Sequence, residues 1–182
     1  LSLHDALPIY RVGHLTDQLY HYVPDRFEEG YGLSYEGIDY GLARGVSLVI
    51  VLDCGIKGHD YVAYASEHGM DVIIGDHHTP GEALPPAHTI LNPKQQDCPY
   101  PYKELSGCGI GFKLIQALHQ QYPQAPDPQD FLDFVAVSTA ADIVEMKDEN
   151  RVLACHGLQK LNDSPNPAFE ALKEVSGLEK AL

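Results

Sequence analysis

The sequence predicts an α/β fold: a doubly wound, mainly parallel sheet flanked by helices, with a helical C-terminal part. Two β-branched and aliphatic runs, within residues 47–53 and 71–78, have the character of strands that are covered on both faces. Helical patterns alternate with these runs at close spacing, which is typical of right-handed crossover connections. Beyond Pro101, apolar residues recur every three or four positions, which indicates helices.

The boundaries of the elements follow from capping residues and from glycine or proline stops. Ser34 is a good N-cap for a helix that runs to about Arg44, where Gly45 ends it. The other expected elements are strands over 18–23, 47–53, 71–78 and 88–93, and helices over 58–68, 105–122, 129–144, 150–161 and 167–175. Residues 1–11 have no clear period, so we expect an unplaced, possibly non-native segment there and one domain over 12–182.

Composition narrows the class of protein. With 12 basic and 26 acidic residues among 182, the net charge of −14 argues against a generic nucleic-acid-binding surface and suits a protein that gathers divalent cations. The four cysteines form no C-x-x-C pair, which favours free thiols in a reducing compartment over a zinc cluster or a disulfide framework. No apolar run approaches the ~18 residues of a membrane span, and no signal peptide is evident. We therefore expect a cytoplasmic protein without a membrane partner.

Polar side chains follow two of the predicted strands. Asp53 comes directly after the first buried run, and Asp76, His77 and His78 end the second. Ligand sites of such sheets lie at the carboxyl ends of the strands, and adjacent strands are about 5 Å apart. One divalent ion could therefore bind between them, and carboxylate with imidazole suits Mn²⁺, Zn²⁺ or Fe²⁺. The alternative is structural, with the aspartate as a turn former or cap and the histidines as polar loop residues.

Asp142 is a third candidate ligand. It lies in the otherwise small or apolar run VAVSTAADIV, where an acid is avoided unless it has a partner. A cap at the end of a helix, or an ion pair with Arg151, would also explain it.

Four blocks of sequence occur in the order and spacing of a known family. They are VPDRFEEGYGLS, DHHTPGEALPPAHTILNP, ELSGCGIGFKLIQAL and ADIVEMKDENR. With these blocks the chain resembles the DHH phosphoesterases and, within them, the RecJ family of single-strand-specific 5′-to-3′ DNA exonucleases. The resemblance runs from about residue 18 to the C-terminus.

The resemblance implies a two-metal phosphodiesterase that uses Mn²⁺ or Mg²⁺ and acts on single-stranded DNA in repair and recombination. In the family pattern, Asp53 matches the acid that bridges both ions, His77 matches a ligand of one ion, and Asp142 completes the shell of that ion. Asp76 would orient the ligands, and His78 would face the scissile phosphate and steady the developing charge.

Two arginines are candidate phosphate contacts. Arg26 lies in the first of the four blocks and Arg151 ends the last. Each could equally be a solvated or ion-paired surface arginine.

The sequence also departs from the family pattern. The family's Asp-x-Asp motif would fall just before Leu1, and His4 and Asp5 do not reproduce it. The C-terminal substrate-binding domain and the OB-fold of RecJ are not matched either, so we expect a catalytic-domain fragment that binds at most one ion well and has little or no activity alone. Two alternatives stay open: a DHH phosphoesterase for oligoribonucleotides, cyclic dinucleotides or pyrophosphate, and a non-catalytic binding module. The sequence does not indicate the oligomeric state.

Overall fold

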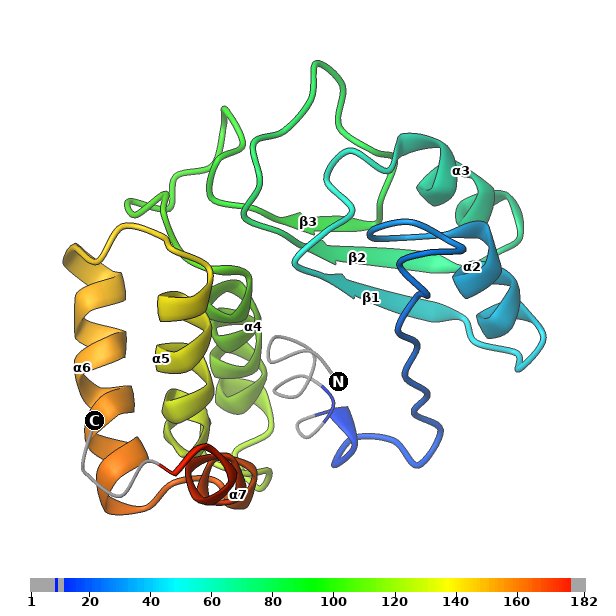
Figure 1. Ribbon diagram of the computed structural model, residues 1–182. Coiled ribbons are helices and arrows are strands. Elements are labelled where there is room, and N and C mark those ends of the chain that lie inside the picture. The colour runs from blue at the N-terminus through cyan, green and yellow to red at the C-terminus, as the bar shows by residue number, and fades with distance from the viewer. Residues whose placement is uncertain (1–8, 10–11, 178–182) are drawn as a thin grey trace.

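The computed structural model describes residue 9 and residues 12–177, so the segment 1–11 lies outside the described residues except for Ile9. The parallel sheet with helices α2 (Tyr35–Leu42) and α3 (His59–Glu67) forms one half of the molecule, and the later helices form the other (Figure 1). No helix within the described residues is long and apolar enough to cross a membrane.

The sheet has three parallel strands in the order β1-β2-β3. They are β1 (Leu48–Leu52), β2 (Asp71–Gly75) and β3 (Thr89–Leu91). Leu52 pairs with Gly75, and Gly75 pairs with Leu91, so the carboxyl ends of the three strands are level. The residues that follow these ends are thereby brought to one edge.

Helices cover both faces of the sheet. On one face, Val72 and Ile74 of β2 pack in a buried cluster with Val62 and Ala65 of α3. On the other face, α4 (Gly107–Gln121) lies against the end of β2, where a Cβ on Gly75 would stand 3.4 Å from Ile110. This arrangement confirms the predicted parallel sheet between helical layers.

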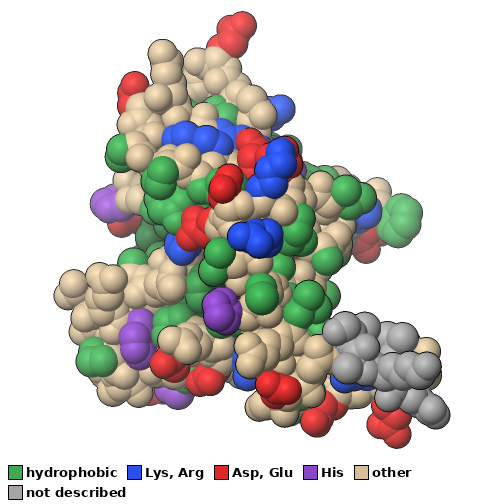
Figure 2. Space-filling view, turned by 90° about the vertical axis from the view of Figure 1, so that its left-hand side faces the viewer, with side chains coloured by type: hydrophobic (Ala, Val, Ile, Leu, Met, Phe, Trp, Pro, Cys, Tyr) green, Lys and Arg blue, Asp and Glu red, His purple; other side chains and the backbone are tan. Residues whose placement is uncertain are grey.

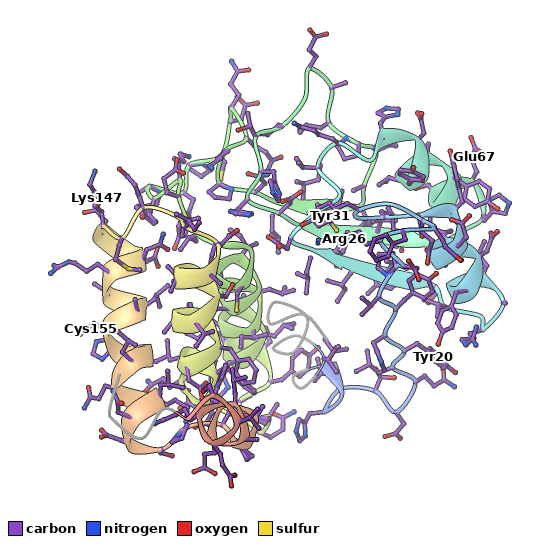
Figure 3. All side chains as sticks on the ribbon, in the orientation of Figure 1. Tyr20, Arg26, Tyr31, Glu67, Lys147 and Cys155 are labelled. Atoms are coloured by element: carbon purple, nitrogen blue, oxygen red, sulfur yellow. The ribbon has the colours of Figure 1, made fainter. Side chains whose placement is uncertain are left out.

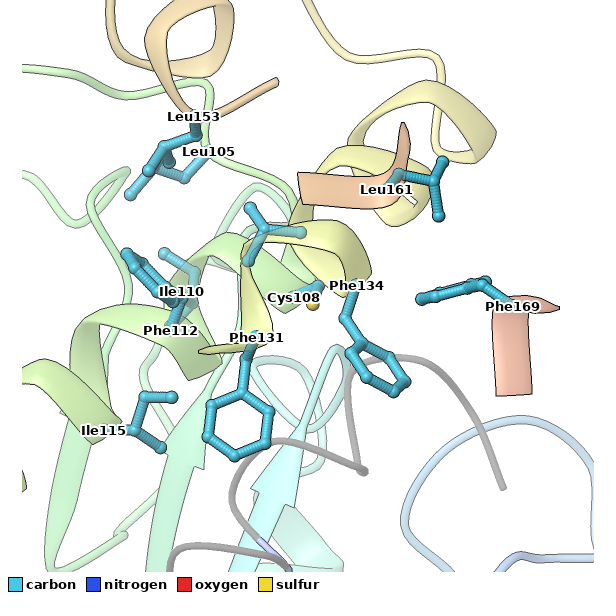
Figure 4. Close-up of a cluster of buried hydrophobic side chains, with 11 residues drawn as sticks. Leu105, Cys108, Ile110, Phe112, Ile115, Phe131, Phe134, Leu153, Leu161 and Phe169 are labelled. Atoms are coloured by element: carbon cyan, nitrogen blue, oxygen red, sulfur yellow. The ribbon is translucent and has the colours of Figure 1, made fainter. Parts of the chain in front are cut away.

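The C-terminal half is a helical layer around a second core. It consists of α4, the 3₁₀ turn η1 (Pro128–Phe131), α5 (Leu132–Ala141), α6 (Asp148–Asp163) and α7 (Pro167–Ser176). Aromatic and aliphatic side chains fill its interior (Figure 4), including Phe112, Phe131, Phe134, Leu161 and Phe169. A Cβ on Gly157 would overlap the carbonyl oxygen of Leu132, so α5 and α6 are in backbone contact there.

Most of the predicted elements are confirmed, but the strand over 18–23 is wrong. Those residues are exposed and form no strand. Tyr22 instead packs its ring on Tyr40 of α2, at 5.0 Å between centroids, and donates a hydrogen bond to Glu29 at 2.7 Å. The segment is therefore held to α2 through the Tyr22 side chain, while its backbone stays unpaired with the sheet.

The predicted helix over 129–144 is shorter than expected. It begins as η1, continues as α5 and ends at Ala141, with Asp142 as its C-cap. The next residue, Ile143, has φ of 54° and is 91% exposed. This left-handed conformation is common for glycine after a helix, but it is strained for a β-branched residue.

Replacing Ile143 by glycine is expected to raise the free energy of unfolding by about 1 kcal/mol, because glycine adopts this conformation without steric conflict. Urea unfolding of the 182-residue chain measures the change. Ile143→Ala is the matched control: it keeps a Cβ in the left-handed region and should recover only the part of the strain that arises from branching. A glycine variant less stable than the parent would mean that contacts of the isoleucine side chain outweigh the strain.

Candidate metal centre

The candidate site begins where β1 ends. The backbone N–H of Asp53 donates to the carbonyl of Gly75 at 2.8 Å, which holds Asp53 beside the neighbouring strand. Its φ of 60° turns the chain away from the sheet. A non-glycine residue held in this region is strained, and such strain is concentrated at functional sites.

His77 brings the ligand candidates together. Its Nε2 atom lies 3.1 Å from Oδ1 of Asp53 and 3.4 Å from Oδ2 of Asp142. Asp142 comes from the end of α5, so the site joins the sheet to the helical half of the chain. The structure thus assembles all three residues that the sequence analysis assigned as metal ligands.

The geometry and chemistry of these groups fit a divalent cation. Neighbouring ligand atoms in an octahedral shell with bonds of about 2.1 Å are about 3 Å apart. The two distances at His77 are close to that spacing. Ligand atoms of Asp53, His77 and His78 also lie within 4.8 Å of one another. His78 could therefore complete a shell of oxygen and nitrogen ligands that suits Mn²⁺.

The electrostatic environment of the site favours positive charge. Burial lowers the pKa of His77, but its close contact with the Asp53 carboxylate and the charge of Asp142 outweigh burial, so the pKa lies above its usual value. The carboxylates therefore favour a positive charge at Nε2, which a proton or a divalent cation could supply.

The buried carboxylate of Asp76 accepts several hydrogen bonds from the protein and does not point at an ion. Its side chain is 1% exposed. Oδ2 accepts from the backbone N–H of Ile56 at 3.0 Å, and Oδ1 accepts from the backbone N–H groups of His77 and His78 at 2.8 and 3.1 Å. Burial raises the pKa of Asp76, but the bonds from Ile56 and His78 lower it more, so the pKa is depressed and the group is a carboxylate.

That carboxylate also orients the second histidine. Nδ1 of His78 lies 2.7 Å from Oδ1 of Asp76, so Nδ1 must carry the proton that is shared in this contact. The Nε2 atom of a neutral His78 is then an acceptor that can bind a cation. Nδ2 of Asn92 donates to the carbonyl of His78 at 2.9 Å, which fixes the loop from its other side.

Gly107 is a site residue that the sequence analysis did not identify. A Cβ on this residue would overlap the Asp53 carboxylate and stand 2.7 Å from the Asp53 Cβ. The first residue of α4 must therefore be glycine for Asp53 to occupy its place. The glycine-rich run SGCGIG was the available signal, but nothing local in that run indicates which of its glycines meets a carboxylate.

Tyr31 is a second residue that the sequence analysis missed. Its hydroxyl donates to the carbonyl oxygen of Asp53 at 3.4 Å, and burial together with the charge of Asp53 raises its pKa. Arg26 lies beside it, with the guanidinium carbon 5.7 Å from the centre of the Tyr31 ring (Figure 3). The loop that carries Arg26 therefore approaches the site through Tyr31.

The other predicted arginine is placed differently. Arg151 is exposed in the first turn of α6. Among the described residues, Asp142 faces His77 and not Arg151, although Asp142 is also the helix-end cap that the structural alternative predicted. A phosphate contact of Arg151 stays a prediction.

Comparison with known proteins points to one family. A sequence model of the DHH family, N-terminal domain, matches residues 3–139. The single-stranded-DNA-specific exonuclease RecJ of Bacillus subtilis is 41% identical over 172 residues, which are 94% of this chain and 21% of that relative. The Escherichia coli protein of the same name is 39% identical over 165 residues, which are 85% of this chain and 29% of that relative. The chain thus spans less than a third of these relatives.

Solved structures agree in fold. A crystal structure of exonuclease RecJ bound to manganese superposes with a TM-score of 0.85 at 32% identity, over 98% of this chain and 46% of that one. RecJ from Thermus thermophilus in complex with Mn²⁺ has a TM-score of 0.78 at 28% identity, over 96% of this chain and 25% of that one. These similarities confirm the resemblance that the four sequence blocks predicted.

Proposed function

The chain belongs to the DHH family, and from this premise we propose that it contributes the metal centre of a RecJ-like exonuclease. The proposed reaction is metal-dependent hydrolysis of single-stranded DNA from its 5′ end, in DNA repair and recombination. The observation that carries the proposal is the convergence of Asp53, His77 and Asp142 at the carboxyl edge of the sheet. The similarity to RecJ proteins over most of the chain supports it.

We propose Mn²⁺ or Mg²⁺ as the ion. Asp53, His77 and Asp142 would hold it, and a bound ion would supply an activated water and stabilise charge on the phosphate. These three residues suffice for one octahedral ion that keeps some of its waters. In a two-metal site, the second ion would need ligands besides these three.

The two remaining residues of the motif have proposed roles that follow from their contacts. Asp76 is a positioning residue because it holds the backbone of both histidines and the Nδ1 proton of His78. His78 is half exposed, and its Nε2 is directed away from the Asp76 contact. Nε2 could therefore face a phosphate oxygen in the protonated ring, or bind the ion in the neutral ring.

Binding of DNA would have to rely on local contacts. The chain has a net charge of −14, and on the face seen in Figure 2 acidic and basic side chains stand next to one another. Of the two candidate arginines, Arg26 is the better placed phosphate contact, because it is held beside Tyr31 near the site.

The reducing cytoplasm is the proposed compartment. None of the four cysteines, all of them among the described residues, is in a disulfide.

The decisive experiment compares substrates with the full-length product of the gene. We expect Mn²⁺-dependent release of nucleotides from the 5′ end of single-stranded DNA, weak action on duplex, and loss of hydrolysis in Asp53→Asn. Preferential hydrolysis of short oligoribonucleotides, cyclic dinucleotides or pyrophosphate would instead favour the other DHH phosphoesterases. Calorimetry that detects no Mn²⁺ binding dependent on Asp53, His77 and Asp142 would favour a non-catalytic module.

A further inference from the structure

A tight turn over residues 25–29 presents one aromatic side chain to solvent. Phe27 is 97% exposed, although its backbone is held firmly. Oδ1 of Asp25 accepts from the backbone N–H groups of Phe27 and Glu28 at 2.8 and 3.3 Å. The N–H of Glu29 donates to the carbonyl of Asp25 at 2.8 Å, which closes the turn.

Glu29 fastens this turn to the body of the domain. Its carboxylate accepts from the backbone N–H of Asp25 at 2.8 Å and from the hydroxyls of Tyr22 and Ser34, both at 2.7 Å. Ser34 is also the N-cap of α2. These bonds lower the pKa of Glu29, the bond from Ser34 most, so the group is ionised at neutral pH. The backbone position of Phe27 is therefore set before any ligand binds.

The turn lies next to the proposed metal centre. Arg26, the neighbour of Phe27, packs over the Tyr31 ring, and the Tyr31 hydroxyl donates to Asp53. Figure 3 shows Arg26 and Tyr31 close together in front of the sheet. A strand of nucleic acid that placed a phosphate at His77 and Asp53 would bring neighbouring nucleotides to this loop.

We propose that Phe27 is a stacking platform for a base of the single-stranded DNA substrate; this rests on the proposed function. An exposed aromatic ring stacks on any base because every base has a π face. The residues around Phe27 in the turn, Asp25, Arg26 and Glu28, are all charged. A single exposed ring beside a cation suits one nucleotide.

The test uses the full-length product and single-stranded oligodeoxythymidylate. Phe27→Leu keeps apolar volume but removes the π face, so the KM should rise by about 10-fold to 100-fold with little change in kcat. Phe27→Trp should restore the parent KM, and Val175→Ala, which removes another exposed apolar side chain on α7, should change nothing. An unchanged KM in Phe27→Leu would overturn the proposal.

A second measurement locates the base and does not depend on turnover. In EDTA, 2-aminopurine placed singly along the oligonucleotide should be quenched on binding at one position, and Phe27→Leu should remove that quenching. An abasic site at that position should weaken binding to the parent protein but add no further loss in Phe27→Leu. If Phe27→Leu lowered the unfolding temperature while binding stayed the same, the ring would pack on protein and the proposal would be wrong. If the quenching depends on Phe27 but the parent protein does not hydrolyse the oligonucleotide in the presence of Mn²⁺, stacking would be supported and the proposed exonuclease would be refuted.

Discussion

Replacement of Gly107 by alanine is expected to weaken Mn²⁺ binding by about 10–100-fold while the chain stays folded. The added Cβ would occupy the space of the Asp53 carboxylate. Asp53 has little freedom to avoid it, because its backbone is in the left-handed region and its N–H is bonded to Gly75. Overpacking costs about 1–3 kcal/mol, and the better helix propensity of alanine offsets about 1 kcal/mol of it. The carboxylate should therefore move, and the fold should persist.

Gly109→Ala is the matched control for Gly107→Ala, two residues along the same helix. A Cβ there would meet Leu105 and Ser106 at 3.4 Å, which is ordinary van der Waals contact. This variant should bind Mn²⁺ like the parent and should be equally or more stable. Isothermal titration with Mn²⁺ and urea unfolding of the metal-free chain separate the two effects. Parental affinity in Gly107→Ala would mean that Asp53 is not a metal ligand in the place where the structure has it.

The sequence was sufficient to predict most of the fold because its signals are local. Ser34, the predicted N-cap, accepts a hydrogen bond from the backbone N–H of Gly37 at the start of α2. The aliphatic runs became β1 and β2 because both faces of the sheet are covered by helices. The extended segment 18–23 shares the tyrosine-rich composition of strands, and composition alone does not indicate whether a partner edge is available.

In the candidate site, too, some contacts follow from local sequence signals and others depend on tertiary packing. Asp53 and His77 could be predicted to meet because strand ends in a parallel sheet lie at one edge. Asp142 was singled out as an acid in an apolar run, but it is an exposed C-cap that reaches His77 from outside the buried part of α5. The pairing of Gly107 with Asp53 joins residues 54 positions apart, and the Tyr31 contact joins residues 22 apart. Such contacts depend on tertiary packing and leave no periodic pattern.

Asp76→Ala is expected to have the largest effect on stability, a loss of about 3–5 kcal/mol in the free energy of unfolding. The substitution removes the acceptor of three backbone N–H groups and of the His78 ring. Each buried donor left without a partner costs about 1–3 kcal/mol. Ile56 and His77 are 2% and 7% exposed, so water reaches their N–H groups poorly, while the half-exposed His78 can be solvated. The expected loss is a large part of the stability of a domain of this size.

Urea unfolding in EDTA measures this loss without a contribution from bound metal, which would otherwise stabilise the parent selectively. Asp71→Ala is the control, because Asp71 begins the same strand and is 69% exposed beside His88. It should change the free energy of unfolding by no more than about 0.5 kcal/mol. Asp76→Asn should lie between the two variants, since its amide oxygen can still accept while its NH₂ group opposes one of the donors. Equal stability of Asp76→Ala and Asp71→Ala would mean that solvent replaces the carboxylate. The inference that Asp76 holds the two histidines in position would then be wrong.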